Sequence, residues 1–180
     1  MWMRLINERR SIRQFKAAPI PPDAQDQLVE AALRSPSSRG FNPWEFIVVS
    51  NTATLEKLSR AKPHGATFLK NAPLGIVVCA DPGQSDVWVE DAAIATLYLH
   101  LTATAVGLGS CWIQIRKRMH NDAMSAEAYI RDLLSIPAHL RVLAIMAVGY
   151  PAEKKEPHGA DYPQYGKVHR EHYATPWKSV

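Results

Sequence analysis

Three arginines and one serine lie within five residues near the start of the chain, at Arg9, Arg10, Ser11 and Arg13. A guanidinium group stays protonated and presents a planar set of donors, so it suits phosphate groups and other anions. Together with the Ser11 hydroxyl, these side chains could hold a phosphomonoester or a polyol chain from several directions. Clustered arginines also form ordinary solvated surfaces, so the segment taken alone leaves both interpretations open.

Two later segments favour the binding interpretation. Residues 35–46 read Ser-Pro-Ser-Ser-Arg-Gly-Phe-Asn-Pro-Trp-Glu-Phe, and residues 107–113 read Gly-Leu-Gly-Ser-Cys-Trp-Ile. Such small and hydroxylated residues belong to capped loops and turns, where a backbone can approach a ligand. The three segments together favour a ligand site over a solvated face.

The composition is that of an ordinary globular protein with a mild positive charge. Of the 180 residues, 47% are hydrophobic and 21% are charged, which supports one well-buried α/β domain and argues against disorder. The net charge of +4 comes from 21 basic and 17 acidic residues, a balance too even for a dedicated nucleic-acid-binding protein. A bound anionic cofactor fits this balance better.

The cysteines and the apolar runs indicate the compartment. Cys79 and Cys111 lie far apart without the spacing of a zinc site, so we expect buried thiols in a reducing compartment. His169 and His172 lack a suitably spaced third ligand group, so no metal site is predicted. No run reaches the roughly 18 apolar residues of a membrane span, and the first residues lack a secretory pattern. We therefore expect a soluble cytoplasmic protein with no membrane partner.

The spacing of apolar residues predicts alternating helices and strands. Strands are expected at residues 45–50, 74–80, 110–115 and 141–149, and helices at about 2–8, 21–34, 52–60, 86–106 and 125–134. The helix at 86–106 is apolar almost all round, so it must be buried in a central layer or in a dimer interface. Gly107 supplies its C-terminal stop.

The chain changes character from Tyr150 onward, where Pro, Lys, His and Tyr predominate. We therefore expect a single domain over residues 1–150 and a C-terminal tail over residues 151–180. Tyrosines and a tryptophan give this tail enough apolar surface to pack on the domain or on a dimer partner.

Four segments give the chain a resemblance to the nitroreductase family of FMN-dependent NAD(P)H oxidoreductases. They are residues 9–15, the serines and Asn-Pro-Trp-Glu-Phe within 35–46, the stretch 91–113, and Val-Gly-Tyr-Pro-Ala-Glu at 148–153. Each segment alone is a weak signal, but four in order at the family's spacing form a strong one. The resemblance covers nearly the whole chain.

The resemblance implies an α+β fold with three α/β/α layers, a mostly antiparallel central sheet and a long buried central helix. It also implies a homodimer with FMN at the subunit interface. Arg9, Arg10, Ser11 and Arg13 match the positions that hold the flavin's phosphate, ribityl chain and pyrimidine edge. Arg13 is the candidate near N1 and the C2 carbonyl, where a cation stabilises the reduced cofactor. Arg9 and Arg10 are expected nearer the phosphate.

The same resemblance implies further cofactor-binding residues: Pro36, Ser37, Ser38, Cys111, Trp112, Ile113, Gln114, Lys155 and Lys167. The segment 36–38 matches one that reaches in from the partner subunit. The stretch 111–114 matches one beside the flavin ring, where the Gln114 amide would donate to N5. Family members also close the phosphate site with basic residues after the last strand. Of the tail lysines, Lys155 and Lys167 are preferred over Lys154.

The chain departs from a common family pattern after this stretch. Many members have glycine there, whereas this chain has Ile115 followed by the basic run 116–118. The basic run could contact a phosphate of FMN or of NADPH, or it could be a solvated loop. Phe41 and Asn42 are expected to shape the substrate pocket, while Trp44 either shares that role or packs in a dimer core.

The predicted function is ping-pong reduction of a small-molecule electron acceptor, such as a nitroaromatic or a quinone, with NADH or NADPH as reductant. FMN carries the chemistry at N5, so no catalytic side chain is predicted and His100 is expected to be a satisfied interior histidine. One alternative is a same-fold flavin protein that does not use NAD(P)H, such as a dehalogenase, dehydrogenase or flavin-cleaving enzyme. Others are a non-catalytic flavin-binding sensor and a polyanion binder.

Overall fold

A sheet of four antiparallel strands lies at the centre of the computed structural model, which describes residues 2–177. The strands are β1 (Trp44–Val49), β2 (Leu74–Ala80), β3 (Gly109–Gln114) and β4 (Arg141–Gly149), in the order β1-β2-β4-β3. Each neighbouring pair is antiparallel, which confirms the expected sheet. The register shifts between Val78 and Cys79, where β4 carries one extra residue, Leu143.

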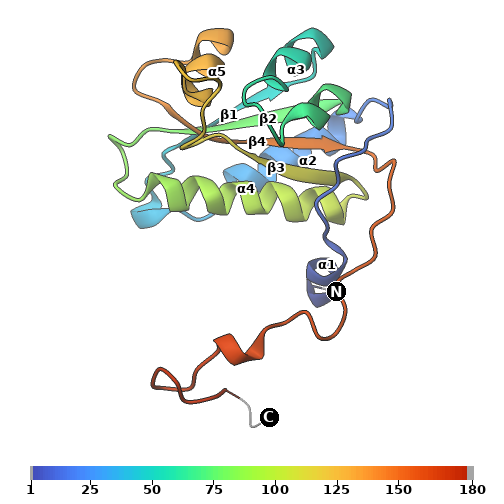
Figure 1. Cartoon of the computed structure of the whole chain (residues 1–180), viewed down its shortest axis with the longest axis vertical. Helices are drawn as coiled ribbons and strands as arrows, with labels where there is room; N and C mark the ends of the chain where they lie inside the picture. The colour runs from blue at the N-terminus through green and yellow to red at the C-terminus, as the bar shows by residue number, and fades with distance from the viewer. Residues whose placement is uncertain (1, 178–180) are drawn as a thin grey trace.

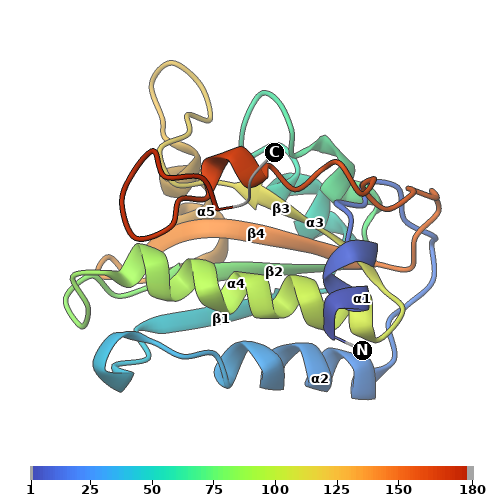
Figure 2. The same cartoon turned by 90° about the horizontal axis from the view of Figure 1, so that it is seen from below.

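Five α-helices lie within residues 2–177; four of them flank the sheet, and the first packs against the fourth (Figure 1). They are α1 (Trp2–Glu8), α2 (Pro22–Leu33), α3 (Thr52–Leu58), α4 (Trp88–Ala105) and α5 (Ala126–Leu134). α3 and α5 lie on one face, and α4 lies on the other with α2 beside it (Figure 2). This arrangement is the predicted three-layer α/β/α fold.

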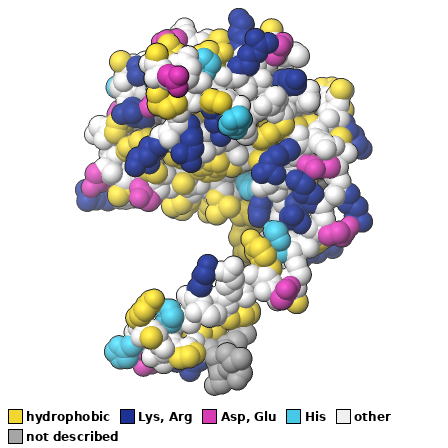
Figure 3. All heavy atoms as spheres, viewed as in Figure 1, with side chains coloured by type: hydrophobic (Ala, Val, Ile, Leu, Met, Phe, Trp, Pro, Cys, Tyr) yellow, Lys and Arg dark blue, Asp and Glu magenta, His cyan; other side chains and the backbone are white. Residues whose placement is uncertain are grey.

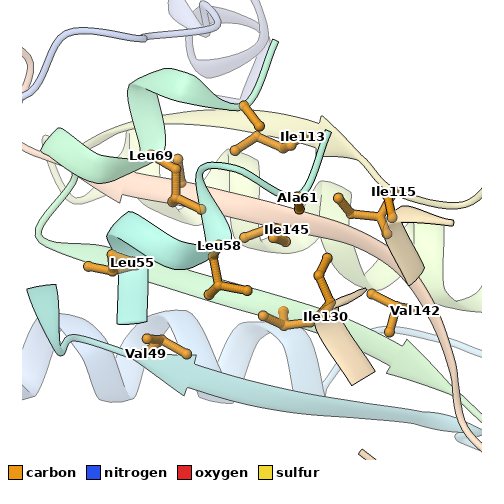
Figure 4. Close-up of a cluster of buried hydrophobic side chains, with 14 of the residues drawn as sticks. Val49, Leu55, Leu58, Ala61, Leu69, Ile113, Ile115, Ile130, Val142 and Ile145 are labelled. Atoms are coloured by element: carbon orange, nitrogen blue, oxygen red, sulfur yellow. The ribbon is translucent and has the colours of Figure 1, made fainter. Parts of the chain in front are cut away.

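The alternation of side chains along the strands divides the core into two halves. On β2, Ile76 points toward α4, whereas its neighbour Val77 points toward α3 and α5. Figure 4 shows the second half, in which Leu58, Ile130 and Ile145 are completely buried. Both free cysteines are buried as well, as the sequence predicted.

α4 is buried along one side and open along the other. Ala95, Leu99 and Ala103 are completely buried, whereas Leu97 and Tyr98 are 50% and 38% exposed. The sequence predicted that this helix lies in a central layer or in a dimer interface. The single chain covers only the side that faces the sheet.

The predicted bounds of the elements differ little from the observed ones. β2 and β4 have the predicted bounds, and β1 and β3 each begin one residue earlier. α4 begins at Trp88 because a turn precedes it, in which the Trp88 amide donates to the Ser85 carbonyl over 3.3 Å. The helix ends at Ala105, and Gly107 just beyond it adopts a left-handed φ of +77°, which glycine tolerates.

Beyond β4, the chain first runs beside its own N-terminal segment and then extends away from the body toward the short 3-10 helix η3 (Tyr165–Lys167) (Figure 1). Tyr162 and Tyr173 in this extension are 58% and 88% exposed. Residues 178–180 of the expected tail lie outside the described residues. In the part of the chain that the structure describes, no helix is long and apolar enough to cross a membrane.

Candidate functional site

The arginine segment is held against the start of β3 and the end of β4. The Ile12 amide donates to the Ser110 carbonyl over 3.0 Å, and the Lys16 amide donates to the Tyr150 carbonyl over 2.9 Å. A Cβ atom at Gly109 would lie 2.8 Å from the side chain of Ile12, so glycine permits this close approach. The two glycine-rich strand ends therefore fix the backbone that carries the arginines.

The first residues after β4 clamp the arginine segment from the other side. One carboxylate oxygen of Glu153 accepts the Arg13 amide over 2.6 Å and the Gln14 amide over 3.3 Å. Lys155 Nζ donates to the Ser11 carbonyl over 2.7 Å and lies 3.3 Å from the same Glu153 oxygen. The hydrogen bond from the Arg13 amide lowers the pKa of Glu153, so the clamp stays charged at neutral pH.

Arg9 is tied to the central helix through His100. Arg9 Nη1 lies 2.7 Å from His100 Nε2, and His100 Nδ1 lies 2.5 Å from Ser110 Oγ. Both ring nitrogens are therefore occupied, and the expectation of a satisfied interior histidine is confirmed. Burial and the neighbouring Arg9 charge lower the pKa of His100 to about 4.

The other two arginines are more open. Arg10 Nη1 donates to the Glu156 carbonyl, and the exposed Arg13 guanidinium lies 5.9 Å from the centroid of the Phe68 ring. Arg13 also borders a cavity of about 810 Å³ together with Lys70. Within residues 2–177, none of the three arginines forms an ion pair with a carboxylate. Three uncompensated guanidinium groups on one clamped segment fit a phosphorylated ligand.

β3 presents backbone donors at the edge of the sheet beside this segment. Ser110 directs its carbonyl away from β4 toward Ile12, whereas the Ile115 amide donates inward to Leu143. Because backbone groups alternate along an antiparallel strand, the amides of Trp112 and Gln114 point outward like Ser110. These outward amides are available to a ligand that lies along the edge.

The β3 side chains of Cys111, Trp112 and Gln114 are not poised to act as nucleophiles. Burial raises the pKa of the Cys111 thiol, although nearby Arg13 acts in the opposite direction, so this thiol stays protonated. Trp112 Nε1 donates to Gln114 Oε1 over 2.9 Å, and Gln114 Nε2 donates to the Arg116 carbonyl over the same distance. Both polar atoms of the Gln114 side chain are thus hydrogen-bonded, so this residue offers a ligand its backbone N–H group.

The serine segment is ordered by a different part of α4. The Ser38 amide donates to Asp91 Oδ1 over 2.7 Å, and Ser85 Oγ donates to Asp91 Oδ2 over 2.7 Å. Ser37 Oγ accepts the Asn42 amide over 2.8 Å and contacts Asn42 Oδ1 over 2.7 Å. Asn42 has a left-handed φ of 49°, a conformation that asparagine tolerates.

Residues around this loop differ in their exposure. Phe41 and Asn42 are exposed, as a substrate pocket requires, and Pro36 is exposed beside them. Trp44 is buried in the single chain, and its Nε1 has no hydrogen-bond partner within residues 2–177. Its position leaves both expected roles for Trp44 open.

A single chain does not bring the arginine and serine segments together. The first is tied to His100 and the second to Asp91, nine residues apart on α4, which is about 14 Å along a helix. Lys155 lies in the arginine cluster, whereas Lys167 lies in the extended tail and Lys154 pairs with Glu156 over 2.8 Å. Among the tail lysines, the described chain therefore joins only Lys155 to the site.

Sequence reasoning assigned no role to Glu153 and Asp91, the two carboxylates that order the site. Both belong to the quoted motifs, but a lone acidic residue resembles any solvated side chain. The available signal was position: Asp91 lies in the first turn of a long helix, and Glu153 follows the last strand directly. Carboxylates in those places can accept hydrogen bonds from neighbouring loop amides.

Comparison with known proteins places these features in one family. The sequence profile described as the nitroreductase family matches residues 6–63 and 59–150. A structure named as an FMN-dependent nitroreductase from Clostridium difficile R20291 is 44% identical, with a TM-score of 0.93, over 94% of this chain and 98% of that one.

Two curated relatives agree with the family assignment. An Archaeoglobus fulgidus protein, provisionally named NADH dehydrogenase/NAD(P)H nitroreductase, is 37% identical over 163 residues, 88% of this chain and 90% of the relative. A Thermus thermophilus protein named NADH dehydrogenase is 28% identical over 187 aligned positions, 83% of this chain and 86% of the relative.

Proposed function

The chain belongs to the nitroreductase family, and we propose that it is an FMN-dependent oxidoreductase that takes reducing equivalents from NADH or NADPH. One observation carries the proposal: an arginine segment whose guanidinium groups form no ion pair within residues 2–177 is held beside outward-facing amides at the edge of β3. Cations at one end and backbone donors along the edge match the phosphate and the ring of FMN.

Each group of the arginine segment has a separate task in this proposal. Arg9 and Arg10 bind the phosphate, and Ser11 binds the ribityl chain. Arg13 lies beside the pyrimidine edge, where its charge favours the reduced cofactor. Lys155 holds the Ser11 carbonyl over 2.7 Å and adds positive charge to the cluster.

β3 supplies the donor at the reactive part of the ring. Bound FMN supplies hydride-accepting chemistry at N5. The outward backbone amide of Gln114 would donate to that atom, and residues Cys111 to Ile113 would hold the ring. The fixed backbone orients the donor without the cost of ordering a flexible side chain.

A second copy of the chain completes the site. Trp2, Leu97 and Tyr98 are exposed and border an apolar cleft of about 440 Å³ between α1 and α4. Figure 3 shows hydrophobic side chains (yellow) exposed along the lower edge of the body, the region that α4 occupies in Figure 1. We propose that a partner covers this surface and that its segment 36–38 and tail, including Lys167, reach the flavin bound by the first chain.

The reaction proposed is a ping-pong cycle. NAD(P)H would deliver a hydride to bound FMN, and after NAD(P)⁺ leaves, a conjugated acceptor such as a nitroaromatic or a quinone would bind in the same place and take up the two electrons. Phe41 and Asn42 border that place from the partner's loop. The basic run 116–118 begins beside Trp88, since the Arg116 guanidinium is 5.7 Å from the Trp88 ring centroid. This basic surface is available to a nucleotide phosphate.

The visible spectrum of the purified protein tests the cofactor and the reductant. We expect a flavin absorption band that bleaches when NADH or NADPH is added without oxygen, and parallel double-reciprocal plots with a quinone acceptor. A bound flavin that neither nucleotide bleaches would contradict the reductase and favour a flavin protein that does not use NAD(P)H. Failure to bind added FMN would contradict the whole proposal.

Arg13→Ala tests the role of the arginine segment. Loss of a charged hydrogen-bond donor predicts FMN binding weaker by about 10- to 100-fold and a lower flavin reduction potential. Fluorescence titration and dye equilibration measure the two quantities. Arg34→Ala is the matched control, because Arg34 is exposed and paired with Glu30 on α2. Equal behaviour of the two variants would contradict the role of Arg13.

A further inference from the structure

We propose that His100 is a positioning residue for Arg9: it orients the guanidinium toward the flavin phosphate and leaves its positive charge unneutralised. The inference rests on the proposed function, in which Arg9 binds that phosphate. It assigns a binding task to a histidine that takes no part in hydride transfer.

The direction of the two hydrogen bonds follows from the donor chemistry. Arginine has donors and no acceptor, so the 2.7 Å contact requires a lone pair on His100 Nε2. The ring proton of the neutral imidazole is then on Nδ1, which donates to Ser110 Oγ over 2.5 Å. Ser110 thus selects the tautomer that can accept from Arg9.

The imidazole of His100 that accepts from Arg9 is neutral, so it does not cancel the positive charge of the guanidinium. His100 is only 9% exposed, and burial followed by the Arg9 charge lowers its pKa to about 4. At neutral pH the imidazole therefore fixes Arg9 without cancelling its charge. A carboxylate in the same place would hold Arg9 equally well but would repel a phosphate dianion.

Ser110 connects this arrangement to the backbone of the site. Its carbonyl accepts the Ile12 amide over 3.0 Å, while its hydroxyl accepts from His100. The start of β3 therefore fixes both the backbone after Arg9 and the ring that orients the Arg9 side chain. Arg9 Nη1 is engaged by His100, which leaves the remaining guanidinium donors to the phosphate.

The ratio of FMN affinity to riboflavin affinity isolates this effect, because riboflavin lacks only the phosphate. In the full-length protein we expect His100→Leu to lower the ratio about tenfold, which corresponds to the loss of roughly one hydrogen bond. His100→Gln, which can accept from Arg9 and donate to Ser110, is expected to restore most of the ratio. Riboflavin affinity should stay nearly constant in both variants.

Arg9→Ala separates this inference from the proposed function. We expect it to reduce the ratio more than His100→Leu does, by about 10- to 100-fold. An unchanged ratio in Arg9→Ala would contradict the phosphate role of Arg9 itself. A reduced ratio in Arg9→Ala with an unchanged ratio in His100→Leu would overturn the positioning role alone.

Two further measurements apply if His100→Leu fails to fold. Ser110→Ala removes the acceptor that fixes the tautomer, and we expect it to lower the ratio about threefold; no change would overturn the inference. The nitrogen chemical shifts of His100 in the protein labelled with ¹⁵N should show an unprotonated Nε2 and a protonated Nδ1. The opposite tautomer would also overturn it.

Discussion

The helix layers on the two faces of the sheet differ in how much apolar surface a single chain leaves exposed. Under α3 and α5, Leu58 and Ile130 are completely buried, and this half of the core is closed (Figure 4). On the other face, α4 buries Leu99 beneath it but leaves Leu97 50% exposed, and Trp2 of α1 is 60% exposed. The core under α3 and α5 is therefore closed, whereas the outer side of α4 exposes apolar side chains to solvent.

The proposed site is tied to the helix on the incomplete face. Arg9 reaches the site through His100 of α4, and the serine segment is tied to Asp91 of the same helix. Two of the segments proposed to bind the cofactor are therefore anchored at separate points on the helix whose outer side is exposed. Folding of the chain and assembly of the site should respond to different substitutions, and that separation can be measured.

Leu58→Ala should produce the largest effect, on the closed face. Removing a completely buried leucine side chain leaves a cavity and should lower the free energy of unfolding by about 2–5 kcal/mol. Urea unfolding monitored by circular dichroism measures the change. Leu97→Ala is the matched control and should cost less than about 1 kcal/mol when the copies are separated by dilution. Equal losses in both variants would remove the distinction between the faces.

The two inner strands and the end of α4 were the parts most fully predictable from the sequence. β2 and β4 have the predicted bounds because their apolar runs are flanked by strong turn residues, and the helix stop at Gly107 follows from the same local chemistry. Such signals are local, so one sequence contains them. The family resemblance implied a mostly antiparallel sheet, but the order β1-β2-β4-β3 was not predicted, because strand pairing depends on contacts between residues distant in the chain.

The candidate site was predictable in its residues but not in its geometry. The arginine segment was singled out from its residue types and the 111–114 stretch from the family resemblance, and the structure places Cys111 beside Ser11 and Arg13. The clamp by Glu153 and the tie to Asp91 were missed, because a carboxylate shows no partner in the sequence. The distance between the serine segment and the arginines depends on the positions of Asp91 and His100 along α4. No local sequence pattern reveals that these two residues contact the two segments.

Leu97→Arg should produce the next largest effect, on the open face. Burying a guanidinium in an apolar interface should weaken association of two copies by about 100-fold, or roughly 3 kcal/mol, with little change in the fold of each copy. Light scattering during size-exclusion chromatography measures the mass. Val48→Arg is the control, since Val48 is 42% exposed but lies on the edge strand β1. A variant that stays dimeric would show that the partner does not cover α4.

Glu127→Gln should produce the smallest of these effects, at the rim of the closed face. Glu127 accepts two hydrogen bonds from Arg141, over 2.6 and 2.7 Å, and one from the Val142 amide over 3.0 Å, which joins α5 to the start of β4. Because the Arg141 side chain is 49% exposed, the expected loss is only about 1 kcal/mol at pH 7. Glu56→Gln is the control, since the Glu56 and Arg60 pair is exposed on both sides and should contribute less than about 0.5 kcal/mol.

The pH dependence of the Glu127→Gln difference shows whether charge causes it. Burial alone would raise the pKa of Glu127, but the Arg141 hydrogen bonds, the Val142 amide and the Arg141 charge together lower it. A carboxyl whose pKa is lower in the folded state stabilises the fold above its unfolded pKa of about 4.3, and this contribution disappears as the pH falls through the folded value. Urea unfolding of the wild type and of Glu127→Gln should therefore differ at pH 7 and converge in acid. A difference that persists at low pH would mean that the negative charge of Glu127 does not cause it, and that packing rather than the ion pair with Arg141 holds α5 at the rim of the closed face.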